Sequence, residues 1–106
     1  MAIRNITTKK ELDKIFSNSK EALIVIDFYA AWCGPCKLVA PHFQKFSQKY
    51  TDVVFIKVDI DDADELAELY EIKVMPTFYF IKNGVTITSL EGNCVDEIKA
   101  TIENHK

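Results

Sequence analysis

The feature that most constrains the fold is the run from Leu23 to Tyr29, an almost unbroken series of aliphatic and aromatic side chains. Strands that are covered on both faces show such continuous apolar runs, whereas half-exposed strands alternate between apolar and polar residues. We therefore expect this segment at the centre of a sheet, with helices on both sides. The one charged residue in the run is Asp27.

Segments before and after this run predict alternating strands and helices. Residues 2–6 are expected to form a first strand, and residues 53–59 a third one, with a helix between each pair of strands. The first helix is expected to start at Thr8 and Glu11. These residues have the spacing of a capping box, in which each side chain accepts a hydrogen bond from the other residue's backbone.

Two further helices follow from the spacing of apolar residues. Such residues recur at helical intervals from Cys36 to Tyr50 and predict a helix of about four turns. Pro41 lies inside this helix and removes the hydrogen bond to the carbonyl of Lys37, so we expect a bend there. Asp62 is expected to cap a short third helix.

The last third of the chain predicts a hairpin and a final helix. Asn83-Gly84 separates residues 77–82 from residues 85–90, and this dipeptide is the strongest short-range hairpin signal. A last helix is expected over about 94–105. Helices between the first three strands imply parallel crossovers, and the hairpin adds antiparallel strands. The sequence thus predicts an α/β fold with a central mixed five-stranded sheet, flanked by four helices on both faces.

Composition narrows the possible functions. With 48% hydrophobic residues, the 106-residue chain can form a single domain, residues 1–106, whose core needs no metal or structural disulfide. A net charge of −3 without a basic run indicates no nucleic-acid partner. The N-terminus lacks a secretory-signal pattern, and the apolar stretch from Ala22 to Trp32 is too short to span a bilayer. We therefore expect no membrane partner and a cytoplasmic location, where three cysteines indicate catalysis or metal binding.

The segment Cys33-Gly34-Pro35-Cys36 lies where the buried run gives way to a helix. Unpaired N–H groups and the positive end of the helix dipole favour a thiolate there, so Cys33 is expected to be the nucleophile. A spacing of three residues allows the redox disulfide Cys33–Cys36. Gly34 leaves room for an approaching chain, and Pro35 suits the first helical turn, where its missing N–H costs nothing.

Half of a zinc site is the alternative interpretation of this spacing. Such a site needs two more ligands, and apart from carboxylates the chain offers Cys94, His42 and His105, none of which forms a second pair. Both histidines are expected to face solvent. We prefer the redox interpretation, with no metal and no bound cofactor.

The chain resembles the thioredoxin family in three segments: Asp27-Phe28-Tyr29-Ala30, Trp32-Cys33-Gly34-Pro35-Cys36-Lys37 and Met75-Pro76-Thr77-Phe78. The resemblance covers essentially the whole chain and includes Lys57, Pro41, Gly84 and Gly92. It implies the thioredoxin fold and a protein-disulfide reductase. Cys33 would attack a disulfide in a client protein, and Cys36 would resolve the mixed disulfide. A thioredoxin reductase would recycle the protein with electrons from NADPH.

Asp27 has the strand parity of Leu23 and Val25, so we expect it to be buried, with a pKa raised by desolvation. The resemblance places this acid beneath the resolving cysteine, where it would accept the proton of Cys36. A solvent-exposed carboxylate is the alternative.

Lys57 is an isolated charge in an apolar run. Its side chain therefore either extends to the end of the sheet or meets a carboxylate, and the resemblance suggests Asp27 as that neighbour.

The resemblance also implies a surface on which client proteins dock. A cis peptide bond between Met75 and Pro76 would bring the residue 75 backbone beside the sulfurs, ready to pair with an extended segment. The alternatives are a plain turn at this proline and a core position for Trp32. Asp61 matches a family acid that can hydrogen-bond the indole of Trp32. The apolar rim of the docking groove would be formed by Trp32, Val74, Met75, Pro76 and Gly92.

Cys94 departs from the common pattern of the family. The simplest interpretation is a small residue without a role, in a monomer. Its place at the start of the last helix could instead lower its pKa and allow glutathionylation or a disulfide-linked dimer.

Two other functions remain open. An oxidase or isomerase of folding proteins is disfavoured by Pro35, and a scaffold would not need the cysteines.

Overall fold

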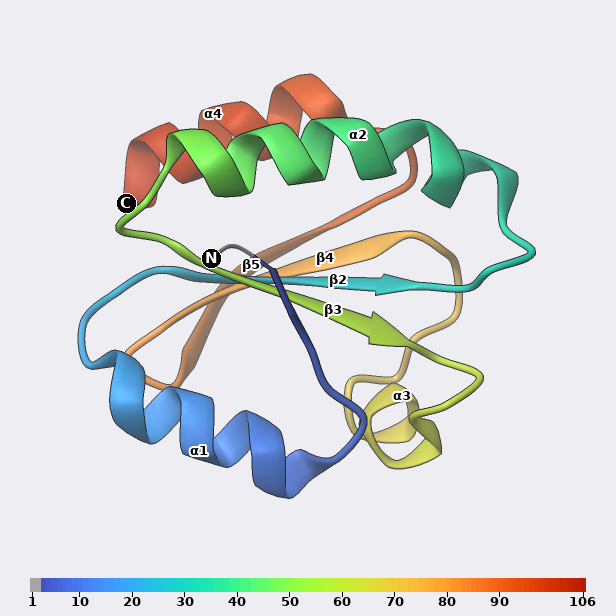
Figure 1. Cartoon of the computed structure of the whole chain (residues 1–106), viewed down its shortest axis with the longest axis horizontal. Helices are drawn as coiled ribbons and strands as arrows, with labels where there is room; N and C mark the ends of the chain where they lie inside the picture. Colours follow the sequence, from blue (N-terminus) through green and yellow to red (C-terminus); the bar gives the residue numbers. More distant parts are fainter. Residues whose placement is uncertain (1–2) are drawn as a thin grey trace.

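The computed structural model describes residues 3–106 and shows a five-stranded sheet between two layers of helices (Figure 1). The strands are β1 (Ile3–Asn5), β2 (Ile24–Tyr29), β3 (Val54–Asp59), β4 (Thr77–Lys82) and β5 (Val85–Glu91). The helices are α1 (Lys9–Ser19), α2 (Gly34–Lys49), α3 (Asp64–Leu69) and α4 (Val95–His105). The predicted α/β fold, with a mixed sheet and four helices on its two faces, is confirmed.

The run that begins at Leu23 forms the central strand, as expected. The strand order is β1-β3-β2-β4-β5, so β2 has two strands on each side. It pairs in parallel with β3 and antiparallel with β4. Every residue from Leu23 to Phe28 is buried, which explains why the run contains so few polar side chains.

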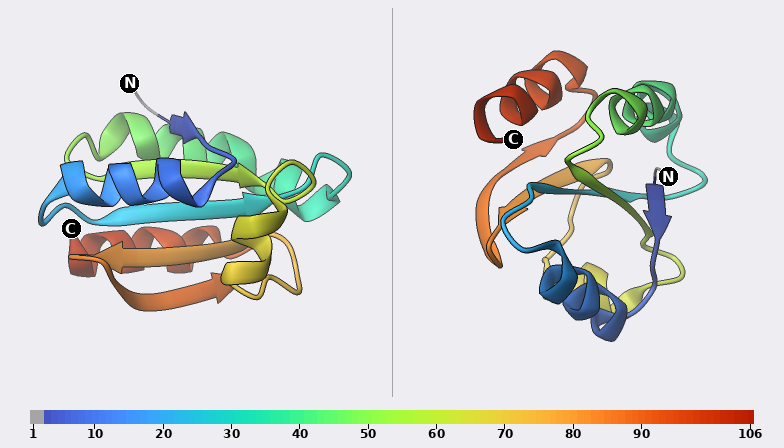
Figure 2. Two further views of the ribbon diagram at one scale, coloured as in Figure 1. Left: turned by 90° about the horizontal axis from the view of Figure 1, so that it is seen from below. Right: turned by 60° about the vertical axis from the view of Figure 1, so that its left-hand side comes forward.

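Alternate residues of β2 point into two separate cores. Leu23 and Val25 pack with Phe43 of α2 and Ile98 of α4, whereas Ile26 packs on the opposite face with residues of α1 and α3. Figure 2 shows the two helix layers on either side of the sheet. Because side chains alternate along a strand, Asp27 faces the same layer as Val25, beneath α2 and α4.

Helix α1 begins at the predicted capping box. The Thr8 hydroxyl accepts a hydrogen bond from the Glu11 backbone N–H at 3.2 Å, and the Glu11 carboxylate accepts one from the Thr8 backbone N–H at 3.1 Å. Leu12 and Ile15, one helical turn apart, are buried against the sheet.

The expected cap of the third helix is wrong. Ala63, and not Asp62, occupies the N-cap position of α3, and no side chain caps this helix. The preceding turn is held instead by the Asp59 carboxylate, which accepts a hydrogen bond from the Asp61 backbone N–H at 3.0 Å. Asp64 supplies negative charge in the first turn, which the helix dipole favours without a cap.

Other boundaries differ little from the expected ones. Strand β1 starts at Ile3, and Ala2, the first residue of the expected strand, lies outside the described residues. Pro41 lies inside α2, which runs unbroken as one helix across it, and the bend that we expect there stays a prediction. No helix in residues 3–106 combines the length and the apolar character that crossing a membrane requires.

The hairpin between β4 and β5 turns at the predicted dipeptide. Asn83 and Gly84 have φ values of 55° and 75°, and two successive residues with positive φ are the mark of a type I′ turn. The pairing shifts between Phe80 and Ile81, which places one extra residue in β5. Strand β5 is a half-exposed strand at the edge of the sheet.

The capping box of α1 yields a test of stability. Thr8→Ala leaves the Glu11 N–H without its acceptor and should lower the free energy of unfolding by about 1 kcal/mol. Ser17→Ala, which removes an exposed hydroxyl from the interior of the same helix, should be neutral or slightly stabilising. Urea unfolding of both variants measures the difference, and equal effects would contradict the role of the cap.

Candidate active site

Cys33 stands at the junction of the central strand and helix α2. It is the N-cap residue, and its Sγ accepts a hydrogen bond from the backbone N–H of Cys36 at 3.1 Å. Pro35 lies in the first turn, as the sequence predicts. The sulfur of Cys33 thus takes the place that a hydroxyl or carboxylate oxygen usually has at a helix start. This arrangement favours negative charge on that sulfur.

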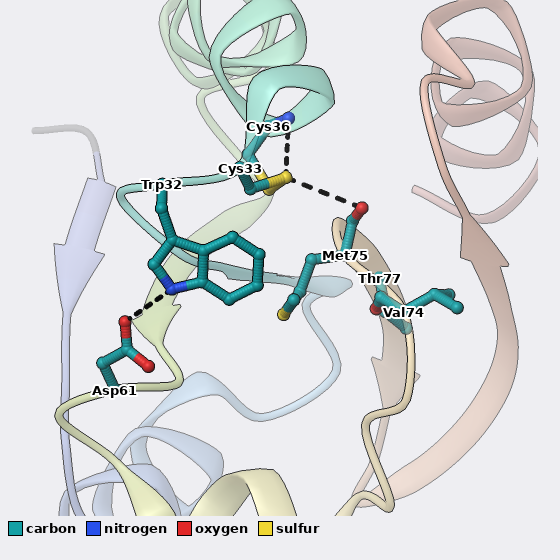
Figure 3. Close-up of a disulfide and its surroundings, with 7 residues drawn as sticks. All are labelled: Trp32, Cys33, Cys36, Asp61, Val74, Met75 and Thr77. Carbon is teal, nitrogen blue, oxygen red and sulfur yellow. Dashed lines mark hydrogen bonds between the residues drawn. A yellow bond between two sulfur atoms is a disulfide. The ribbon is translucent and has the colours of Figure 1, made fainter.

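The two cysteines of the motif are joined. Cys33 and Cys36 form a disulfide with their Cα atoms 5.3 Å apart, so the structure shows the oxidised form of the pair (Figure 3). Both residues are buried except for a small accessible fraction. A Cβ atom added at Gly34 would meet nothing within 4 Å. The space beside Gly34 is therefore open to another chain, in agreement with the expected role of this glycine.

A backbone edge lies directly beside the sulfurs. The Met75–Pro76 peptide bond is cis, as the resemblance implies, and the carbonyl oxygen of Met75 is 3.6 Å from the Sγ of Cys33. The Gly92 N–H donates a hydrogen bond to the Pro76 carbonyl at 2.8 Å, and the Thr77 hydroxyl donates one to the Val74 carbonyl at 2.6 Å. These bonds fix the segment from which the Met75 carbonyl projects.

The expected docking residues surround this edge. Trp32 is 65% exposed and Val74 44% exposed, so the alternative of a core position for Trp32 is wrong. The Trp32 indole N–H donates to the Asp61 carboxylate at 3.0 Å, as the resemblance suggests (Figure 3). Met75 and Gly92 are half-buried, and Pro76 is buried. Gly92 has a φ of +85°, a backbone conformation that favours glycine.

Asp27 is buried on the face of β2 that α2 and α4 cover. Its exposed fraction is 2%, and its Oδ1 atom has no hydrogen-bond partner, so the alternative of an exposed carboxylate is wrong. Burial raises the pKa of Asp27 from 3.8 to about 7, and the positive charge of Lys57 lowers it in part. A carboxyl group with this pKa can take up and release a proton near neutral pH.

Lys57 is the expected neighbour of Asp27 but forms no ion pair with it. The two residues are register partners on β2 and β3. Within residues 3–106 the ion pairs shorter than 4.0 Å join other residues, Lys9 with Asp13 and Lys106 with Glu103. The Lys57 ammonium lies instead over the ring of Tyr29, 4.3 Å from its centroid. Tyr29 therefore belongs to this site, although its place in an apolar run gave no sign of it.

Cys94 differs from what its position suggests. It is the N-cap residue of α4, but its side chain makes no capping bond and packs in the core beneath α2 and α4. Burial, together with the negative charges of Glu97 and Asp27, raises the pKa of Cys94 to about 11. The hypothesis of a lowered pKa at this cysteine is therefore wrong, and the helix dipole is outweighed by desolvation.

The remaining candidate ligands do not come together. Across residues 3–106 the structure has no group of three His, Cys, Asp or Glu side chains placed to hold a metal ion. His42 is exposed as expected, whereas His105 is half-buried. The zinc interpretation therefore gains no support, and the arrangement around Cys33 is that of a dithiol–disulfide pair.

Comparison with known proteins gives a consistent result. The model of the Thioredoxin family matches residues 4–104. Thioredoxin from Equus caballus is 40% identical over 101 residues, which cover 95% of this chain and 96% of the relative. Thioredoxin H-type from Oryza sativa subsp. indica is 42% identical, with 92% and 81% covered. The crystal structure of Fasciola hepatica thioredoxin superimposes with a TM-score of 0.95 at 39% identity, covering 97% of this chain and 99% of that one.

The buried carboxyl group predicts a pH-dependent effect on stability. The folded protein holds the Asp27 proton more tightly than the unfolded chain, so its stability falls as pH rises from about 4 to about 7 and then levels off. Asp27→Asn cannot ionise and should not show this loss. The difference between pKa values of 3.8 and about 7 corresponds to about 4 kcal/mol. This is an upper value for the increase in the free energy of unfolding that Asp27→Asn should show over the wild type above neutral pH.

Urea unfolding at acidic and alkaline pH measures this gain. The free energy of unfolding of Asp27→Asn should match that of the wild type at acidic pH and exceed it at alkaline pH. Asp52→Asn, at an exposed site, should change this free energy little at either pH. A gain from Asp27→Asn that is the same at both pH values would contradict the assignment of the raised pKa to Asp27.

Proposed function

Because this chain belongs to the thioredoxin family, we propose that it passes electrons from NADPH, through a thioredoxin reductase, to disulfides in client proteins. The chain is a thiol–disulfide oxidoreductase of the thioredoxin type, with protein-disulfide reductase activity. The source of its electrons, its individual partners and its cellular location are parts of the proposal.

The observation that carries the proposal is the position of the Cys33–Cys36 pair. The pair lies at a helix start, and the Met75 carbonyl is 3.6 Å from one sulfur. An extended client segment can form strand-like hydrogen bonds with the Met75 backbone and so present its disulfide to Cys33. Exposed apolar side chains beside this edge, Trp32 and Val74, give such a segment a surface on which to bury its own apolar groups.

In the proposed reaction the Cys33 thiolate attacks one sulfur of the client disulfide. A bond forms between Cys33 and the client, and the other client sulfur leaves as a thiolate. The Cys36 thiol then gives its proton to Asp27 and attacks the Cys33 sulfur, which releases the second client thiolate. Two electrons have passed to the client, and the product is the Cys33–Cys36 disulfide found in the structure. The reductase returns two electrons and restores both thiols.

Gly34 and Pro35 support this site by leaving space and starting the helix, and Lys57 supports it through its charge beside Asp27. Pro76 and Gly92 complete the docking groove, because the bond between them holds the Met75 segment in place. We propose that residues 1–106 act as one thioredoxin domain and as a monomer, since the buried Cys94 thiol is not presented to a partner. A cytoplasmic location is proposed because a dithiol reductant works where thiols are kept reduced.

Insulin reduction, coupled to NADPH and a thioredoxin reductase, tests the function. The wild type should turn over, and Cys33→Ser should lose activity because the attacking sulfur is gone. Cys36→Ser should accumulate a mixed disulfide with insulin, visible by mass spectrometry, since the resolving thiol is missing. Cys94→Ala, a substitution at the third cysteine, should remain active. No turnover by the wild type with a competent reductase would favour the scaffold function instead.

The role of Asp27 is tested by the second half of the reaction. With Asp27→Asn, resolution of the mixed disulfide should slow by roughly a hundredfold at neutral pH, because no group accepts the Cys36 proton. In the wild type this rate should fall as pH drops below about 7 and Asp27 becomes protonated, and the variant should lack that dependence. Stopped-flow measurement gives both rates, and equal rates at neutral pH would exclude Asp27 as the proton acceptor.

A further inference from the structure

A groove lies outside the docking surface, between helix α2 and the edge of the sheet that ends in β1. Its volume is about 860 Å³. Neither cysteine of the disulfide and no residue of the docking rim lines it. The lining residues are Ile3, Asn5, Lys37, Ala40, Pro41, Gln44 and Lys57.

The polar groups of this groove are of one kind. Lys37 and Lys57 carry ammonium groups, Asn5 and Gln44 carry carboxamides that can donate hydrogen bonds, and no carboxylate is among the lining residues. Helix α2 contains no Asp or Glu at all, although the chain has 16 acidic residues and a net charge of −3. The groove is thus a local concentration of positive charge on a negatively charged protein.

Both ammonium groups remain available to a ligand. Within residues 3–106, neither Lys37 nor Lys57 forms an ion pair. Lys57 contacts the face of the Tyr29 ring through its charge. This contact leaves the N–H groups of the ammonium free to donate hydrogen bonds to oxygen atoms. Isoleucine, alanine and proline side chains form the apolar part of the lining of this open groove.

We propose that this groove binds a small divalent oxyanion such as phosphate. Two ammonium groups match the two charges of such an anion, and the carboxamides can donate to its remaining oxygens. The ligand is held by side chains from β1, α2 and β3 together, so all three elements contribute to one site.

The site is coupled to the buried acid through Lys57. Asp27 is paired across the sheet with Lys57 on β3 and with the uncharged Phe78 on β4. Its charge also acts on Cys94 at the start of α4 and on Tyr29 of its own strand. Lys57 is the cation of this group, and its charge favours the ionised form of Asp27. An anion against Lys57 offsets that charge, so Asp27 ionises at higher pH. This consequence rests on the proposed role of Asp27, and oxyanion binding would then slow the resolving step near neutral pH.

A phosphate titration of the oxidised protein, followed by ¹H–¹⁵N NMR, tests the site without a client or a reductase. Chloride at matched ionic strength is the reference. Amide signals of Asn5, Gln44 and Lys57 should shift and saturate with phosphate but not with chloride. Lys37→Ala should weaken binding by about tenfold, the loss of one charge-assisted contact. Lys45 is an exposed lysine of the same helix outside the groove. The dissociation constant of Lys45→Ala for phosphate should stay within about twofold of the wild-type value.

Chemical shifts that grow without saturation would overturn the site, and so would an equal loss of phosphate affinity in Lys37→Ala and Lys45→Ala. Neither result would affect the proposed reductase function. A parallel titration with succinate distinguishes a phosphate site from a general dianion site, and saturation by either ligand supports the proposal. The coupling is read from the ¹³C signal of the Asp27 carboxyl group, whose titration midpoint should move to higher pH with saturating phosphate. Binding without that movement would overturn the coupling.

Discussion

The carboxyl group of Asp27 is withdrawn from water by the helices that cover this face of β2, and the proposed proton transfer depends on this desolvation. No hydrogen bond satisfies its Oδ1 atom, and the ammonium of Lys57 lies over the ring of Tyr29 and forms no ion pair with Asp27. Its pKa of about 7 therefore follows from burial and not from a specific partner. The same covering layer raises the pKa of Cys94. The core thus raises the pKa of one acid to about 7 and that of one thiol to about 11.

Much of the fold could be predicted because its signals are local. The continuous run of β2, the capping box of α1 and the Asn83-Gly84 turn each act over a few residues, and each lies where we expect it. The cap of α3 could not be predicted in this way. Three side chains in this region are suited to capping, those of Asp59, Asp61 and Asp62. The conformation of the turn after β3 decides which backbone N–H each carboxylate can reach. In so short a helix, a shift of one residue changes the cap.

The candidate site was predictable in part. The position of Cys33 follows from the strand–helix junction, but its contact with Met75 joins residues 42 positions apart. Only the sheet order brings them together, and local patterns do not determine that order, so the resemblance to a family was needed. The ring contact of Tyr29 has no local signal, and the alternative of a lowered pKa for Cys94 is wrong, for a common reason. The sequence shows that a residue lies in an apolar run or at a helix start, but not which neighbours its side chain meets.

The hydrogen bond between Trp32 and Asp61 has a consequence for spectroscopy. Trp32 is the only tryptophan of the chain, and it lies on the docking surface next to the disulfide, with its indole held by a carboxylate. All indole fluorescence of this protein therefore originates at the active site and none in either core. An emission change reports first on the surroundings of one exposed ring, whereas the global state of the fold must be followed through another signal, such as far-ultraviolet circular dichroism.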